Sequence, residues 1–335
     1  PSDLLFSILC SLNQWFSSTD VRIIFIFWGA YRPVSFVLLG FSRKISYICC
    51  PSNLKRAQTM TKARILYVSQ HLVPFLPETP MSSISRHLPQ GTHDKGREIR
   101  VFMPRFGKIN ERRHQLHEVI RLSGMNLNID DVDHPLIIKV ASIPTARMQV
   151  YFIDNDDLFK RKAVLYDAND ELFADNDVRA IFFVRGVLET VRKLGWAPDV
   201  IHCHGWMANL LPLYLKNNYA DDPYFANSKV VCSIYDEGFE GSLDARLSEK
   251  VSLDGIDDEK VQTIKNATFN NMNAIAIENA DALITASEDL DEETTSKMAA
   301  AGVPVLPFPG EKGYLAEINQ FYDEVLEGKF EAVGE

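Results

Sequence analysis

The sequence predicts an α/β protein in which a parallel, Rossmann-like sheet carries helices on both faces. Two observations predict this fold class. From Met60 onward, short apolar segments alternate with segments of helical periodicity, and such alternation is typical of a parallel sheet that is covered on both sides. The apolar fraction of the 335 residues is 46%, which is ordinary for a globular protein and provides enough side chains for a large core.

The predicted strands are short apolar segments, and the predicted helices repeat apolar residues every three or four positions. We expect strands at 63–69, 97–104, 136–143, 148–155, 199–204, 229–236 and 280–287. We expect helices at 82–96, 175–196, 207–218, 265–280 and 315–328. The polar, irregular segments 105–135 and 156–175 are expected to be loops or insertions.

Local signals support two of the predicted helices. Ile84 and Leu88 have helical spacing in the first helix, and Gly96 is a suitable stop. The helix at 175–196 begins with Asp175 and Asn176, and either side chain can accept a hydrogen bond from a free amide of the first turn.

Net charge and cysteine content narrow the class of protein. The formal net charge is -10, and an acidic protein is poorly suited to bind nucleic-acid backbones. Cys203 and Cys232 both lie in predicted strands. This placement does not resemble a disulfide framework and indicates a cytoplasmic protein.

Residues 1–59 form an apolar and basic leader that differs from the rest of the chain. They contain six basic and two acidic residues, a net of +4, so the remaining residues carry -14. Arg32 and Pro33 separate two apolar runs, 21–31 and 34–41, and neither run reaches the ~20 residues that a membrane helix needs. We expect the leader to lie outside the fold or outside the native protein, with a start at Met60. A membrane anchor or export signal is the alternative.

The segment DVIHCHGW, residues 199–206, is the strongest candidate for a functional site. Strand alternation places His202 and His204 on one face and Cys203 on the other. Gly205 frees the backbone, and Trp206 offers a flat apolar surface. Ligands of parallel sheets bind where strands end, and an aromatic ring beside polar groups is suited to a sugar.

Other interpretations of these residues are structural. Buried histidines are commonly hydrogen-bonded core residues. A metal site from His202, Cys203, His204 and Cys232 is disfavoured, because alternation directs Cys203 away from the histidines. Paired acid–base carboxylates at Asp236 and Glu237 are also disfavoured, since adjacent residues at a strand end point apart.

Several segments, in order and at matching spacing, resemble the bacterial glycogen synthases and plant starch synthases. The resemblance covers about Met60 to Pro309. It rests on REIRVFMPRF (97–106), VYFIDNDDLF (150–159), DNDVRAIFF (175–183), DVIHCHGWMANLLPLYL (199–215) and KVVCSIYDEGFEG (229–241).

This resemblance implies one lobe, the N-terminal one, of a two-lobed GT-B glycosyltransferase in glycogen biosynthesis. Members of the family are retaining hexosyltransferases that move glucose from ADP-glucose onto an α-1,4-glucan, without a metal or other cofactor. The first lobe mainly holds the acceptor, and the second holds the nucleotide. We therefore expect ADP-glucose and an α-glucan as ligands, and no membrane association for residues 60–335.

The resemblance also implies a set of site residues. His204 takes the position of the family's pocket histidine and is the candidate catalytic residue. The candidate substrate-binding residues are Asp175, Asn176, Arg179, Trp206, Tyr235 and Asp236. For Asp175, Asn176 and Arg179, a capped helix with an internal charge pair is an equally open interpretation.

Other positions depart from the family pattern. Pro77 stands where the family has a lysine, Thr79 and Pro80 replace two glycines, and Gly205 replaces an aspartate. These departures remove a cation and a backbone donor that would face a diphosphate. We therefore expect the single lobe to be inactive alone.

The alternatives are a non-catalytic module that binds a glucan or a partner, or a small-molecule binding protein of unrelated use. Without a second lobe, the residues of the cleft face (His204, Trp206, Tyr235 and Asp236) are expected to be exposed, or covered by a partner chain or a homodimer.

Overall fold

The computed structural model describes residues 23–24, 38–41, 44–46 and 62–328. The chain divides into two compact units, residues 1–61 and 62–335. In the first unit, strands β1 (Ile23–Ile24), β2 (Leu38–Phe41) and β3 (Lys44–Ser46) pair antiparallel. The candidate site lies in the second unit.

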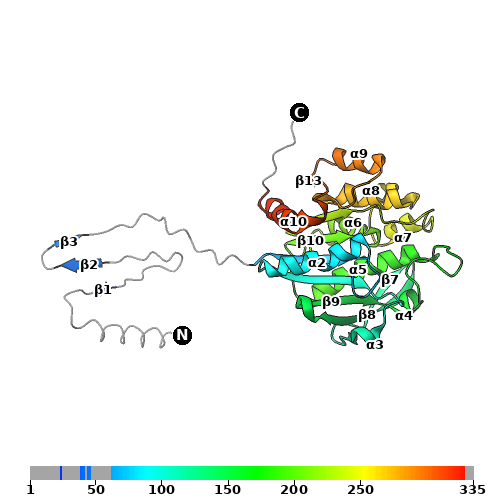
Figure 1. Ribbon diagram of the computed structural model, residues 1–335, viewed down its shortest axis with the longest axis horizontal. Helices are drawn as coiled ribbons and strands as arrows, with labels where there is room; N and C mark the ends of the chain where they lie inside the picture. Colours follow the sequence, from blue (N-terminus) through cyan, green and yellow to red (C-terminus); the bar gives the residue numbers. More distant parts are fainter. Residues whose placement is uncertain (1–22, 25–37, 42–43, 47–61, 329–335) are drawn as a thin grey trace. The chain divides into compact units, whose positions relative to one another are not determined.

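A single mixed sheet forms the centre of the second unit (Figure 1). Its strand order is β13-β12-β11-β10-β4-β5-β9-β8-β6, and β7 pairs with β8 alone. Neighbours from β13 to β9 are parallel, whereas β8 and β6 are antiparallel. The bounds are β4 Arg64–Ser69, β5 Glu98–Pro104, β6 His117–Glu118, β7 Met125–Ile129, β8 Val132–Ile143, β9 Met148–Asp154, β10 Val200–His204, β11 Lys229–Ile234, β12 Ala282–Thr285 and β13 Val305–Leu306.

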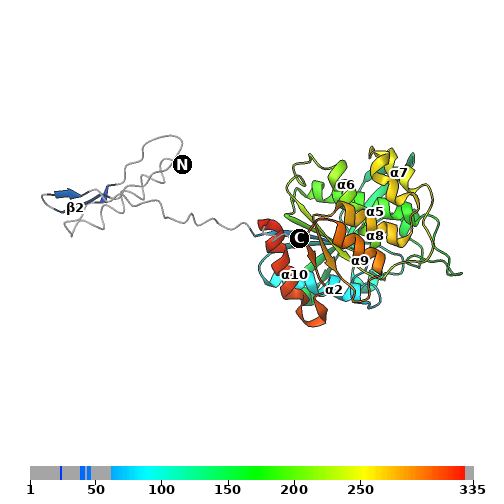
Figure 2. The same ribbon diagram turned by 90° about the horizontal axis from the view of Figure 1, so that it is seen from above.

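Helices cover both faces of this sheet. On one face α2 and α10 lie together (Figure 2). From the sheet, Tyr67 contacts Thr92 of α2, and His202 contacts Tyr322 of α10. On the other face α5, α6 and α8 pack side by side. The helices are α2 Pro80–Asp94, α3 Glu111–His114, α4 Asp156–Phe159, α5 Asn176–Leu194, α6 Leu211–Asn217, α7 Leu247–Leu253, α8 Phe269–Asn279, α9 Glu292–Ala300 and α10 Gly310–Glu327, with 3-10 turns η1 Pro144–Ala146, η2 Trp206–Ala208 and η3 Asp258–Lys265.

The predicted α/β fold with a parallel sheet and helices on both faces is confirmed. Each predicted strand is present, with bounds that shift by a few residues. The segments 136–143 and 148–155 form an antiparallel hairpin. The central strands β4 and β10 are almost fully buried. This burial on both faces explains why their apolar runs are continuous rather than alternating.

Two sequence-based expectations are wrong. Segment 105–135, expected to be loops or insertions, is not all loop, because β7 and the start of β8 form a hairpin whose turn residues Asp130 and Asp131 have φ of 52° and 59°. Aspartate tolerates this left-handed conformation. The helix expected at 207–218 is split into η2 and α6, and Pro212 lies in the first turn of α6, where its missing amide is tolerated.

Among the residues that the structure describes, no helix is long and apolar enough to cross a membrane.

We predict that a chain beginning at Met60 folds as the full chain does. The described core lies in the unit from residue 62 onward, so its free energy of unfolding should change by less than about 0.5 kcal/mol, the range of substitutions away from a core. Urea unfolding of the two chains by circular dichroism measures this. Aggregation of the shortened chain under conditions where the full chain stays soluble would contradict the prediction.

Candidate functional site

The carboxyl ends of β4, β10 and β11 meet the start of α2, and this junction is the candidate site. His204 ends β10, and its register partners are Ser69 of β4 and Ser233 of β11. The Gln70 amide donates to the His204 carbonyl at 2.9 Å. The sheet thus brings these strand ends together, as expected for a ligand site of a parallel sheet.

His202 and His204 are fully buried on the same face of β10, as the sequence predicts. Their ring centroids lie 4.0 Å apart. His204 Nδ1 is 2.8 Å from the Tyr235 hydroxyl, and its Nε2 is buried with no partner among the described residues. A buried ring nitrogen without a partner is costly, and it marks the point where a ligand atom would be favourable.

A chain of hydrogen bonds extends from His202 across the same face. His202 Nδ1 lies 2.6 Å from the Tyr322 hydroxyl, and Nε2 lies 2.8 Å from Ser233 Oγ. Tyr322 donates to the Tyr67 hydroxyl at 3.3 Å, and Tyr67 lies 2.7 Å from Thr92 Oγ1. Helices α2 and α10 are therefore joined to β10 through buried polar groups.

Burial keeps both histidines neutral. It lowers the pKa of His204 to about 3. Burial, with a further contribution from the His204 ring, lowers the pKa of His202 well below its ordinary value. The site therefore offers neutral imidazole, which can hydrogen-bond a hydroxyl but carries no positive charge at neutral pH.

Side chains of the same chain fill the space beside Gly205. The φ of Gly205 is 86°, and a Cβ there would lie 2.9 Å from both Gln70 Cβ and Met81 Sδ. Gln70 Oε1 also accepts a hydrogen bond from the Met207 amide at 3.2 Å. No larger side chain fits at Gly205 unless Gln70 and Met81 move.

The first amides of α2 already have partners. Thr79 and Ser82 form a reciprocal capping box: the Thr79 amide donates to Ser82 Oγ at 2.7 Å, and the Ser82 amide to Thr79 Oγ1 at 3.2 Å. The Met81 amide donates to Glu237 Oε1 at 2.8 Å. A helix N-terminus favours an anion, and here the carboxylate of Glu237 fills that role.

The other residues predicted at the strand ends differ in exposure. Trp206 and Tyr235 are buried, and Trp206 packs edge-to-face on Phe239 at 4.8 Å. The expectation of an exposed cleft face is therefore wrong for His204, Trp206 and Tyr235, because loops and α2 cover them. Asp236 is exposed, and Ser287 Oγ donates to its carboxylate at 2.6 Å.

Asp175, Asn176 and Arg179 form a second group, at the start of α5. Asp175 occupies the N-cap position but makes no side-chain capping bond, because both of its oxygens accept from Arg161, at 2.6 and 2.8 Å. Arg179 is fully buried and donates to Asn176 Oδ1 and the Val164 carbonyl. This arrangement fixes segment 160–173 over α5; ligand binding by these residues stays a prediction.

Aromatic rings surround Arg179. Its guanidinium carbon lies 5.1 to 5.5 Å from the ring centroids of Phe106, Phe159 and Phe173. Burial, followed by the charge of Arg161, lowers the pKa of Arg179 to about 10. Arg179 therefore stays charged at neutral pH and is held mainly by carbonyl oxygens and aromatic faces.

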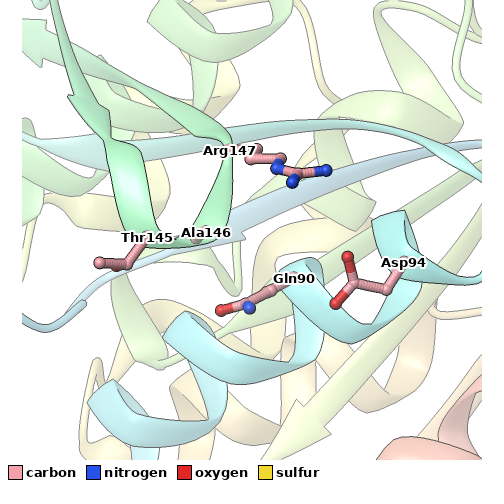
Figure 3. Close-up of a pocket in the computed structure, with 5 residues that line it drawn as sticks. All are labelled: Gln90, Asp94, Thr145, Ala146 and Arg147. Atoms are coloured by element: carbon pink, nitrogen blue, oxygen red, sulfur yellow. The ribbon is translucent and has the colours of Figure 1, made fainter.

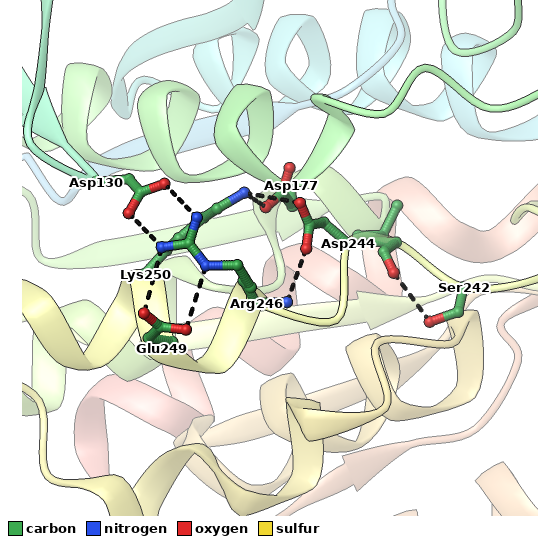
Figure 4. Close-up of polar contacts among 8 residues, drawn as sticks. Asp130, Asp177, Ser242, Asp244, Arg246, Glu249 and Lys250 are labelled. Carbon is green, nitrogen blue, oxygen red and sulfur yellow. Dashed lines mark hydrogen bonds and ion pairs between the residues drawn. The ribbon is translucent and has the colours of Figure 1, made fainter.

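A buried ion pair attaches the segment after β11 to the start of α5 (Figure 4). Lys250 Nζ lies 2.5 Å from Asp177 Oδ2 and 3.2 Å from Asp244 Oδ2, and both Lys250 and Asp177 are buried. Arg246, which is exposed, pairs with Asp130 and Glu249 at the surface. These contacts hold segment 238–247, including Phe239, over Trp206.

The residues that close the site are not among those predicted from the sequence. Gln70, Met81 and Tyr322 were not singled out, and Glu237 was considered only as a catalytic carboxylate. The Thr79-Pro80 pair is a helix-start signal, an N-cap residue followed by proline, and it could have located the start of α2. No local signal identifies Tyr322, because its contact with His202 spans 120 residues.

Within the described ranges, no cluster of three or more His, Cys, Asp or Glu side chains could hold a metal ion. Cys203 and Cys232 are register partners on neighbouring strands, and both are buried free thiols.

Comparison with known proteins gives a consistent result. Residues 64–304 match the family of the starch synthase catalytic domain. The glycogen synthase of Chlorobium limicola is 36% identical over 225 residues, which are 67% of this chain and 45% of that protein. The glycogen synthase of Chlorobium luteolum is 34% identical over 256 residues, 75% of this chain and 51% of that protein. The chain thus spans about half the length of these curated relatives.

A solved structure shows the same fold. The catalytic domain of starch synthase IV from Arabidopsis thaliana, bound to ADP and acarbose, aligns with a TM-score of 0.60 at 14% identity. The alignment covers 74% of this chain and 51% of that one.

We predict that the buried histidines make the protein sensitive to acid. In the unfolded chain a histidine takes up a proton near its ordinary pKa of 6.5, whereas folded His204 does so only near 3. Stability is therefore lost as the pH falls from about 6.5 towards 3. Between pH 7 and pH 5, His204 alone should account for about 2 kcal/mol of the loss.

Urea unfolding at pH 7 and pH 5 measures this loss in the original chain and in His204→Gln. The His204→Gln chain should lose about 2 kcal/mol less between the two pH values. His87→Gln, which changes an exposed histidine on α2, is the matched control and should behave as the original chain does. An equal loss in the His204→Gln and original chains would contradict the prediction.

We also predict that Lys250 is more important for stability than Arg246. Lys250→Met leaves the buried Asp177 carboxylate without its cation, and breaking a buried pair costs about 3 kcal/mol or more. Arg246→Met removes only exposed pairs and should change little. Thermal unfolding of both variants tests the order, and equal effects would contradict it.

Proposed function

The chain belongs to the starch synthase catalytic-domain family, and on that premise we propose that residues 62–328 form the acceptor-side lobe of an α-glucan glucosyltransferase. The proposed donor is ADP-glucose, and the proposed acceptor is an α-1,4-glucan. The family match over residues 64–304 and the glycogen synthase relatives support this reaction class. The free thiols Cys203 and Cys232 support a cytoplasmic location.

The proposal assigns His204 to contact the glucosyl group. Its Nε2 is the unpartnered polar atom at the end of β10, and Tyr235 holds the ring through Nδ1. Because its pKa is about 3, His204 acts as a neutral hydrogen-bonding group and not as an acid. Trp206 and Asp236 would form the walls of the sugar site. Asp175, Asn176 and Arg179 would support its donor side through segment 160–173.

We further propose that this lobe does not transfer glucose by itself. In the transfer, the bond between the anomeric carbon and a diphosphate oxygen breaks, so positive groups must face the departing diphosphate. The observation that carries the proposal is the contact between Glu237 and the Met81 amide. This contact places a carboxylate at the helix N-terminus, where it would repel a diphosphate.

The filled space beside Gly205 supports the same conclusion. Gln70 and Met81 lie against Gly205, and His204 is fully buried. A donor could reach His204 only if the start of α2 and segment 235–239 moved apart. The proposal therefore requires a separate nucleotide-binding surface, in this chain or in a partner, and this surface must move the start of α2 and segment 235–239 apart.

A non-catalytic glucan-binding module is the second candidate function, and the closed site favours it specifically. A lobe whose donor site is filled can still bind glucan on its surface. One measurement distinguishes the two candidates, namely glucose transfer in the presence of a second protein that binds the nucleotide. The binding module would bind maltoheptaose but would not restore this transfer.

The test is an incubation of the purified 335-residue chain with radiolabelled ADP-glucose and glycogen, followed by counting of precipitated polymer. We expect no label above background, because the loss of even one preorganised hydrogen-bond donor that faces the departing group typically lowers the rate ~10²–10³-fold. His204→Ala is the control for chemistry at this site. Label that appears with the original chain and is lost in His204→Ala would overturn the proposal that the lobe is inactive.

A further inference from the structure

A polar surface pocket lies apart from the candidate site, between the last turns of α2 and the turn that joins β8 to β9 (Figure 3). Its volume is about 270 Å³, which is large enough for a monosaccharide-sized ligand. Gln90 and Asp94 line it from α2, and Thr145, Ala146 and Arg147 line it from the turn. Nine residues separate Met81 from Gln90, or about 13 Å along the helix, so this pocket is distinct from the strand-end site.

A buried arginine underlies both walls of the pocket. Arg86 is 9% exposed, and it donates from one nitrogen to Gln90 Oε1 at 2.8 Å and from the other to Thr145 Oγ1 at 3.2 Å. Among the described residues, no carboxylate pairs with Arg86. A buried charge with only neutral partners is unfavourable, so a counter-anion near these walls would be stabilised.

Arg86 also fixes the hydrogen-bonding character of the walls. Because arginine can only donate, Gln90 must present its oxygen to Arg86, which leaves its NH₂ group free to donate elsewhere. Thr145 Oγ1 accepts from Arg86, so its own hydroxyl proton is available. Both side chains are thereby converted into donors for a ligand.

Arg147 adds an exposed positive charge at the rim. It is exposed, its backbone has a φ of 49°, and within the described part of the chain its side chain has no hydrogen-bond or ion-pair partner. In Figure 3 its guanidinium extends over the pocket towards the side where Asp94 lies. Asp94 is the one carboxylate among the lining residues, and it too is unpaired within the described ranges.

We propose that this pocket binds a phosphate group carried by a hydroxylated molecule, a sugar phosphate in chemical class. Arg147, the Gln90 amide and the Thr145 hydroxyl donate to the phosphate oxygens, since a guanidinium fits an oxyanion through two parallel hydrogen bonds. Asp94 accepts from a hydroxyl of the same ligand. The positive charge of Arg86, which contacts Gln90 and Thr145 from inside the protein, offsets the negative charge of the phosphate.

The test is calorimetric titration of the full chain with glucose 6-phosphate, inorganic phosphate and glucose. We expect glucose 6-phosphate to bind more tightly than phosphate, and glucose not to bind. Arg147→Gln should weaken binding of both phosphates at least tenfold. Arg112→Gln, which removes an exposed arginine on α3 far from the pocket in sequence, is the matched control and should have no effect.

A second variant tests the role of the carboxylate. Asp94→Asn should strengthen the binding of inorganic phosphate, because a negative charge is removed, and should reduce the preference for glucose 6-phosphate over phosphate. The proposal is overturned if neither phosphate binds at about 10 mM, a threshold of weak affinity, if Arg147→Gln and Arg112→Gln weaken binding equally, or if glucose binds as tightly as its phosphate. None of these outcomes depends on glucose transfer, so they are separate from the test of the proposed function.

Discussion

The buried pair His202–His204 is the constraint on which the site depends. Two polar rings on the central strand β10 must remain neutral and must find hydrogen-bond partners away from water. Tyr322 and Ser233 satisfy His202, and Tyr235 satisfies one nitrogen of His204. These bonds tie α10 and the end of β11 to the central strand.

The same constraint closes the strand ends. Once Tyr235 is held against His204, it packs with Met81 of α2, and Glu237, two residues later, reaches the Met81 amide. A carboxylate there caps the helix and opposes a second anion. The residue that orients His204 and the carboxylate that caps α2 therefore belong to one short segment.

The sequence was sufficient to predict the sheet and most of the helices that cover it, because buried parallel strands are continuous apolar runs bounded by polar residues. It also placed His202 and His204 on one face correctly. It failed for the hairpin of β7, whose Asp130-Asp131 turn lacks the usual glycine. It also failed for the exposure of Trp206 and Tyr235, which depends on Phe239 and Met81 from distant segments.

A further contact that the sequence does not reveal is the one between His202 and α10. The family match ends at residue 304, and α10 lies beyond it, yet Tyr322 of α10 completes the hydrogen bonds of His202. Arg97 secures the same helix by donating to the Asn319 carbonyl and the Asp323 carboxylate. The segments on which the resemblance rests end at residue 241, and α10 lies outside them. The hydrogen bonding of the histidine pair thus depends on the strand ends and on α10, which lie far apart in the sequence, and only the folded chain brings the two together.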